Sequence, residues 1–280
     1  MPAILMSNAS TINAENFVDS YVNGNSNLFV AVGRTDEEWA DEAIPPTPTD
    51  VIATEIDMRE RIIGIKKVFI NGIMIMIPRI EWKEGAIFNT ISDTATTGKR
   101  AQDYYCLTSN NDVYQCIVST GKKTVAGAEP TVHGPDVETA DGYHWKYLYT
   151  VTTSMINAGM LLDKWVPVPF NKHGVYPGGT ITDEQYTHGD VNANKILGAY
   201  RVLVTATLDN EGDIIPYDTI YRQVALIADP KDTAGKLLEG DLYGKNDFDY
   251  LSGEMIYLEN RKPVHREESQ KETISLLLIF

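Results

Sequence analysis

Cysteine is scarce in this chain of 280 residues. The two cysteines, Cys106 and Cys116, have no cluster of histidines beside them, which argues against a zinc site. They flank a segment typical of a hairpin turn at residues 109–112, and a reducing compartment would keep both as thiols. We therefore interpret both cysteines as small buried hydrophobic side chains.

Long apolar runs are absent as well. No stretch approaches the roughly 20 apolar residues that a membrane-spanning helix needs. The opening MPAILM has no basic residue and a polar segment follows it, so it does not predict a secretory signal. We expect a protein that is kept in the cytosol or assembled there into a larger particle, without a membrane partner.

Basic residues are fewer than acidic ones. Lys and Arg number 24 against 39 Asp and Glu, which gives a formal net charge of −15 at pH 7. Such a balance argues against a surface that binds nucleic acid. Two interpretations stay open: the acidic surface serves solubility, or it meets a partner with a basic face.

Catalytic motifs are also missing. The sequence has no GxxxxGK(S/T), GxGxxG, GxSxG or HExxH, and its five histidines are not spaced to share a metal. We expect no enzyme, no cofactor and no metal. One alternative is a glycoside hydrolase, because paired carboxylates beside an aromatic ring are typical of such sites. Its candidate residues are Asp136, Glu138 and Asp141, near Trp145.

Most of the chain has the pattern of strands and turns. Helices are expected only at residues 13–22, with Asn13 as N-cap, and from Asp50 as N-cap to a stop at Gly64. The dipeptide Asn71–Gly72 between two apolar runs predicts a hairpin. Segments rich in β-branched and aromatic residues, bounded by Gly, Asn, Asp or Pro, predict strands. They are residues 27–34, 65–82, 103–108, 112–120, 143–152, 195–208 and 221–230.

The C-terminal segment predicts two further strands. Residues 254–259 are apolar at both parities, which predicts a strand covered on both faces. Residues 273–280 predict a strand with one buried face, made by Ile274, Leu276, Leu278 and Phe280. Strands covered on both faces imply more than two layers. The predicted fold is mainly β, a multilayer β-sandwich with a few short helices carried in long loops.

Three long segments have no hydrophobic periodicity: residues 33–50, 119–142 and 169–194. Loops of this length are usually functional or bound to a partner, so we expect interaction segments there. Residues 143–149 instead alternate aromatic and other side chains, which predicts one aromatic face at period two. That face either packs on the core or lies at a subunit interface, where Tyr and Trp are enriched.

The stretch EPTVHGPDVETADGYHWKYLYTV resembles the DGYxWxYLF region of the baseplate wedge protein called gene product eight in T-even and related contractile-tail bacteriophages. LFVAVGRTDEEW with IPPTPTD, IMIPRIEW and YRQVALIADP resemble further elements of that family in the same order. The ending SGEMIYLENRKPV with ETISLLLIF is similar to the family's C-terminus almost residue for residue. The matches extend from Leu28 to Phe280, nearly the whole chain.

The resemblance implies a layered β-sandwich protein without known catalytic activity, located in the tail baseplate of the virion. It implies a homodimer in each wedge that contacts other wedge proteins and helps relay the rearrangement that triggers sheath contraction. Tail-fibre attachment proteins are further candidate partners. The whole chain, 1–280, would form one wedge protein.

The alternative function is a receptor- or carbohydrate-binding module of a tail fibre or baseplate, with Trp145 or Tyr143 as stacking platform. For the wedge hypothesis, Lys262, His265 and Arg266 are expected to be exposed near Pro263. The candidate interface residues are Asp36, Glu37, Glu38, Trp39, Pro45, Pro48, Tyr143, Trp145, Lys262, His265 and Arg266.

Overall fold

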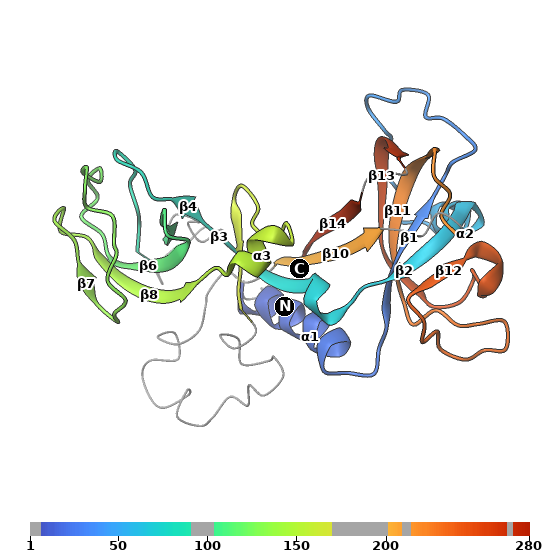
Figure 1. Ribbon diagram of the computed structural model, residues 1–280, viewed down its shortest axis with the longest axis horizontal. Coiled ribbons are helices and arrows are strands. Elements are labelled where there is room, and N and C mark those ends of the chain that lie inside the picture. Colours follow the sequence, from blue (N-terminus) through green and yellow to red (C-terminus); the bar gives the residue numbers. More distant parts are fainter. Residues whose placement is uncertain (1–6, 91–103, 170–200, 209–213, 268–270) are drawn as a thin grey trace, which may run out of the picture. The chain divides into compact units, whose positions relative to one another are not determined.

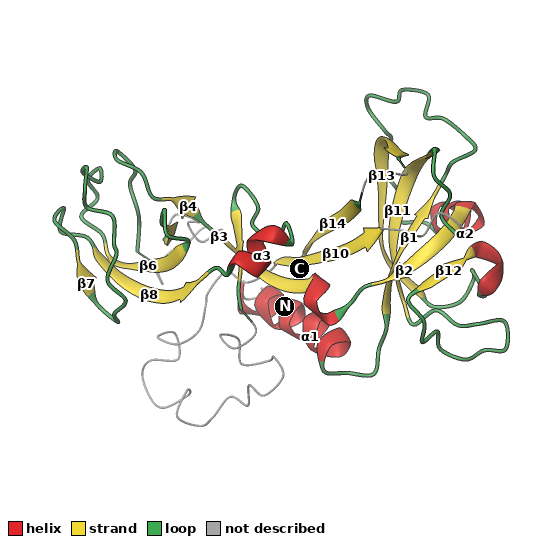
Figure 2. Ribbon diagram, viewed as in Figure 1, coloured by secondary structure: helices red, strands yellow, loops and turns green. Residues whose placement is uncertain are grey.

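The computed structural model describes residues 7–90, 104–169, 201–208, 214–267 and 271–280. In this part of the chain strands predominate, as Figure 2 shows, and the helices α1 (Ser7–Val22), α2 (Ile52–Arg61) and α3 (Thr153–Asn157) are short. The expected mainly-β fold is thus confirmed. None of the helices described is both long and apolar enough to cross a membrane.

The chain divides into two compact units, each built from separate stretches of sequence. We call Met1–Asp19, Met74–Leu203 and Leu277–Phe280 the first unit. Ser20–Ile73 and Val204–Leu276 form the second unit.

The first unit contains a five-stranded sheet with the order β4-β5-β6-β8-β7. Its strands pair antiparallel except for β4 and β5, and Cys106 pairs with Tyr114 as the turn at 109–112 predicts. The strands are β4 (Ile80–Glu81), β5 (Tyr105–Leu107), β6 (Asp112–Val118), β7 (Val137–Glu138) and β8 (His144–Thr150).

The core of this sheet is largely aromatic. Phe88 packs edge-on against Trp145, with ring centroids 4.9 Å apart, and Tyr143 stacks on Trp145 at 5.7 Å. Cys106 and Cys116 are free thiols in the same buried cluster, as expected. Burial raises the pKa of the Cys106 thiol well above its usual value, so the side chain behaves as a small hydrophobic group.

A second sheet has the strand order β14-β10-β3-β9. The part of it that belongs to the first unit has a core rich in methionine. Met74 and Met76 of β3 pack with Trp165 of β9 and Leu203 of β10. The ring of Phe17 in α1 packs against the ring of Phe280, with the two centroids 5.2 Å apart. The strands are β3 (Ile73–Pro78), β9 (Trp165–Pro167), β10 (Arg201–Leu208) and β14 (Glu272–Ile279).

The second unit contains a five-stranded sheet with the order β12-β2-β1-β11-β13, whose pairs are antiparallel (Figure 1). Every residue of β1 is buried, because β1 lies at the centre of the sheet and both faces are covered. Met58 of α2 joins Phe29 and Ile227 in the core over this sheet. The strands are β1 (Leu28–Gly33), β2 (Ile62–Lys67), β11 (Thr219–Ala228), β12 (Leu242–Gly244) and β13 (Glu254–Arg266).

Several local predictions are wrong. Asn71 and Gly72 lie in a 3₁₀ turn, η1 (Ile70–Gly72), and the flanking strands β2 and β3 belong to different sheets instead of forming a hairpin. Helix α1 begins at Ser7 and not after Asn13. Helix α2 ends at Arg61 and has Val51 as its N-cap, without a side-chain capping bond from Asp50.

The two C-terminal strands differ from each other. In β14 the side chains of Ile274, Leu276 and Leu278 are buried on one face, as predicted. In β13, by contrast, Ile256 is 40% exposed, so the prediction of a strand covered on both faces is wrong. The physical reason is position: among the described strands, β13 lies at the edge of its sheet.

Candidate interaction surface on the second unit

The acidic stretch that follows β1 is an exposed part of the second unit. It begins at Arg34, whose φ of 56° turns the chain away from the strand. The side chains of Asp36 and Glu38 are 69% and 81% exposed. Residues 36–38 therefore present carboxylates to solvent, as the sequence predicts.

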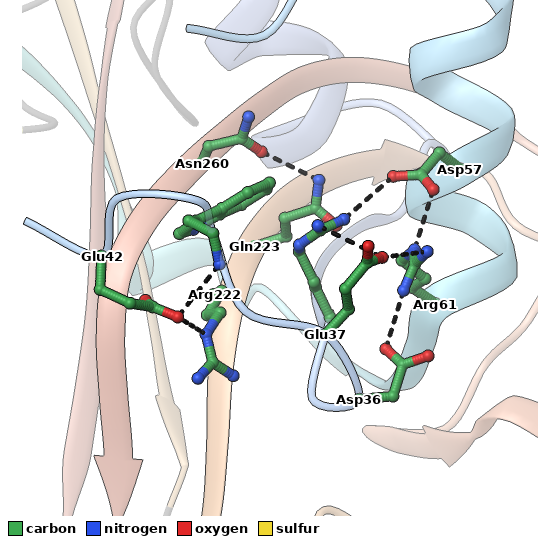
Figure 3. Close-up of polar contacts among 10 residues, drawn as sticks. Asp36, Glu37, Glu42, Asp57, Arg61, Arg222, Gln223 and Asn260 are labelled. Atoms are coloured by element: carbon green, nitrogen blue, oxygen red, sulfur yellow. Dashed lines mark hydrogen bonds and ion pairs between the residues drawn. The ribbon is translucent and has the colours of Figure 1, made fainter. Parts of the chain in front are cut away.

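Arg61, at the end of α2, holds the first part of this stretch in place (Figure 3). Its guanidinium lies 2.9 Å from Asp36 Oδ1 and 2.6 Å from Glu37 Oε2. Its Nε lies 2.8 Å from Oδ1 of Asp57, one helical turn earlier in α2. One cation thus joins the loop to the helix.

These contacts change the protonation equilibria of the pair. Desolvation acts to raise the pKa of Asp36, but a backbone hydrogen bond and Arg61 outweigh it, so the pKa lies below its usual value. The hydrogen bond to Asp57 contributes most to raising the pKa of Arg61. Because the folded-state pKa of Asp36 is depressed, its contribution to stability is present above the unfolded-state pKa and is lost as pH falls through the folded-state value.

Trp39 anchors the middle of the loop. The guanidinium of Arg34 lies over its ring, 3.8 Å from the centroid, in a cation–π contact. The indole Nε1 donates to the carbonyl oxygen of Arg261 in β13 at 2.9 Å. Trp39 is therefore half-buried and fixes the loop on the sheet edge.

Arg222 holds the end of the acidic stretch. Its Nε lies 2.7 Å from Oε1 of Glu42, which also accepts from the backbone N–H of Trp39 at 3.0 Å. Glu38 is farther from Arg222, at 3.8 Å. Because the Arg222 side chain is only 6% exposed, its carboxylate partners balance a nearly buried charge.

The proline-rich crossing continues along β13. Asn260 Nδ2 donates to the carbonyl oxygen of Pro46 at 2.8 Å, and Pro45 and Pro48 are half-buried. The structure thus brings Asp36, Glu37, Glu38, Trp39, Pro45 and Pro48 together on one continuous segment of the second unit.

The remaining predicted interface residues lie elsewhere or are hidden. Lys262 and His265 are exposed, but Arg266 is 1% exposed, because its guanidinium donates to the carbonyl of Ile215 and lies over the ring of Tyr217. The expectation that Arg266 is exposed is therefore wrong.

Tyr143 and Trp145 are both 0% exposed, in the core of the first unit. Of the two interpretations of the aromatic face, packing on the core is correct for these residues. Neither ring can serve as a surface platform for stacking a sugar.

The carboxylates considered for a glycosidase make local contacts. Asp136 Oδ1 lies 2.7 Å from His144 Nδ1, and Asp141 accepts from the hydroxyl of Thr139 at 2.7 Å in the turn before β8. Within the described residues no group of three His, Cys, Asp or Glu side chains could hold a metal ion.

Of the two other long segments, residues 119–142 lie within the described part of the chain. This loop packs on its own sheet, where Glu129 accepts from the backbone and hydroxyl of Ser109 and His133 stacks on Tyr147. Of the third predicted segment, residues 169–194, only Pro169 belongs to the described residues.

Sequence reasoning missed the arginines that organise the surface. A signal existed for Arg61, because a carboxylate four residues earlier on a helix predicts an i,i+4 ion pair. None existed for Arg222, which interrupts a buried strand and whose partners lie about 180 residues earlier in the chain.

Known proteins include relatives of this chain. The model of the family described as "Bacteriophage T4, Gp8" matches residues 91–280. The chain belongs to this family of phage proteins. It is also 25% identical to the baseplate wedge protein gp8 of Enterobacteria phage T4, in an alignment that covers 99% of this chain and 97% of that protein.

Proposed function

We propose that this chain is a structural component of a contractile phage tail baseplate wedge, where it joins neighbouring wedge proteins. The observation that carries the proposal is the alignment with the T4 wedge protein, which spans nearly the full length of both chains. It supports a structural role in the tail baseplate of the virion. Residues 1–280 act as one wedge protein, and a homodimer is its working form.

The contact surface of this role is the acidic stretch with the proline-rich crossing. Its carboxylates are exposed, while the arginines that hold it are largely buried. Such a surface presents negative charge on a fixed backbone and suits a partner with a basic face. Tail-fibre attachment proteins are a further class of partner with which this surface can be tested.

The same surface can help to relay the rearrangement that triggers sheath contraction. A relay needs contacts whose free energy differs between two baseplate states. Among the described residues, Glu38 has only the 3.8 Å contact with Arg222, so a basic side chain of a partner can recruit it in one state and release it in the other. Exposed ion pairs are worth about 0–1 kcal/mol each, so several must change together.

The test is charge reversal at Glu38 in baseplate assembly. Glu38→Lys should leave the fold intact, since the side chain is 81% exposed, and should lower incorporation of the protein into baseplates about tenfold. Incorporation is measured by quantitative immunoblotting of purified particles. Glu84→Lys, an equal charge change at an exposed residue of the first unit, is the matched control. Equal incorporation of both variants and the parent would contradict this surface, and absence of the parent from particles would contradict the proposed function itself.

A further inference from the structure

Strand β13 gives the second unit an unusually long free edge. It has 13 residues, whereas β12, at the opposite edge of the same sheet, has 3. Among the described strands, β13 pairs only with β11. Proteins usually shorten, cover or twist such edges, because their backbone groups can pair with another chain.

The loop described above covers one part of this edge and leaves another open. Trp39 and Pro46 contact Arg261 and Asn260. Residues 255–258 instead line a groove of about 420 Å³, whose other wall is formed by the end of the crossing and the start of α2. The residues that line the groove are Pro48, Thr49, Asp50, Val51, Ile52, Glu55, Met255, Ile256, Tyr257 and Leu258.

The groove follows the edge of the strand and not one of its faces. Successive side chains of a regular strand point to opposite faces, yet Tyr257 and Leu258, which pair with consecutive residues of β11, both line the groove. On the opposite wall, Val51 and Ile52 are 52% and 76% exposed. An edge strand beside apolar side chains has the form of a site for β-strand addition, in which backbone bonds provide affinity and side-chain pockets provide specificity.

The charge around the groove is negative. Asp50 lines the groove and is exposed, and Glu254, directly before the lining residue Met255, is exposed as well. Glu55 faces Arg59, whose side chain is 4% exposed and therefore offers little positive charge to a ligand. Glu259 faces Arg261 and also accepts from the hydroxyl of Tyr257 at 3.0 Å.

We infer that this groove receives an extended segment of a neighbouring protein, in which basic side chains alternate with apolar ones. The segment adds a strand to β13 at residues 254–258, its apolar side chains contact Ile52 and Ile256, and its cations face Asp50 and Glu254. The inference rests on the proposed function, since it names the chemistry of a partner in the baseplate.

A second copy of this chain fits the edge less well. Two β13 strands paired antiparallel about an axis between Ile256 and Tyr257 would place Glu254 of one copy opposite Glu259 of the other. Like charges directly opposite each other destabilise a strand pair. The exposed carboxylates of Asp50 and Glu254 favour a basic segment of another protein, and the homodimer should use another surface.

The test uses the full chain and a fluorescent peptide of alternating lysine and valine, with a peptide of alternating glutamate and valine for comparison. Fluorescence anisotropy should show saturable binding of the lysine peptide that weakens with salt, and no binding of the glutamate peptide. The double variant Asp50→Lys, Glu254→Lys should weaken binding about tenfold, which corresponds to about 1.4 kcal/mol. The control, Glu239→Lys with Asp241→Lys beside β12, carries the same charge change at the other edge of the sheet.

Hydrogen exchange locates the bound peptide. Backbone amides within residues 254–258 should exchange more slowly when the lysine peptide is bound, because a new strand pairs with them. Equal affinity for both peptides, no binding, equal loss in both double variants or unchanged exchange would each overturn the inference. So would a change in dimerisation caused by Asp50→Lys, Glu254→Lys alone, which would identify a second copy as the occupant. If the lysine peptide does not bind at the groove but the protein is still incorporated into baseplates, the inference about the groove is wrong and the proposed function stands.

Discussion

At the scale of single residues, the second unit depends on arginines that are nearly buried. Arg59 donates to the carbonyl oxygens of Tyr250, Ser252 and Gly253, all at 2.9 Å, and so fixes α2 to the turn before β13. Arg59 also pairs with the carboxylate of Glu55, and Arg222 pairs with that of Glu42. A buried cation that loses its partner is costly, so these contacts decide how firmly the loop and turn are held.

Glu42 provides the clearest test at this scale. Replacement of Glu42 by Gln removes the charge that balances Arg222 and should lower the free energy of unfolding by about 1–3 kcal/mol. Urea unfolding followed by circular dichroism measures the change. Glu38→Gln, which alters a side chain with 81% exposure, should change it by less than about 0.5 kcal/mol. Similar losses in both variants would contradict the distinction between buried and exposed ion pairs.

The sequence predicted the character of single residues better than their exposure. The exposed acidic stretch was recognisable because consecutive carboxylates can rarely be buried. Arg266 and Trp145 were misplaced as interface candidates because the residues that enclose them come from other parts of the chain, such as Ile215 for Arg266 and Phe88 for Trp145. Alternation along a strand indicates that two faces differ, but it does not indicate what covers each face.

At the scale of elements, strong strands were predictable and their pairing was not. The predicted strand at residues 27–34 contains β1, and the one at 221–230 overlaps most of β11, which begins two residues earlier at Thr219. All of β1 pairs with β11, although nearly 200 positions separate them. The Asn71–Gly72 signal misled because Gly72 packs closely on the backbone of Thr205, where an added Cβ would lie 2.4 Å from the carbonyl oxygen. Tertiary contact thus accounts for this glycine better than hairpin geometry does.

The end of β14 gives a prediction at the element scale. Removal of residues 276–280 deletes buried Leu276 and Leu278 together with Phe280, which packs on Phe17, and should give insoluble protein. The measurement is the soluble fraction after expression, followed by circular dichroism. Ile279→Ser, at a side chain that is 65% exposed, should remain soluble. A soluble and folded truncated chain would overturn the assignment of this end to the core.

At the scale of the whole molecule, composition and motifs restricted the candidate classes of function more than any local structure did. From the net charge of −15 and the lack of catalytic motifs we expected a protein that binds other proteins. Membership of the Gp8 family then agrees with the colinear resemblance seen along the chain. The places where partners bind could not be predicted from the sequence, because a groove such as that beside β13 is formed by segments about 200 positions apart.

Antibody–gold labelling of intact virions of the phage that encodes this protein would show directly whether it is a component of the tail baseplate. We expect label around the periphery of the tail baseplate. Label at the tips of the tail fibres, or no label on the particle, would contradict it.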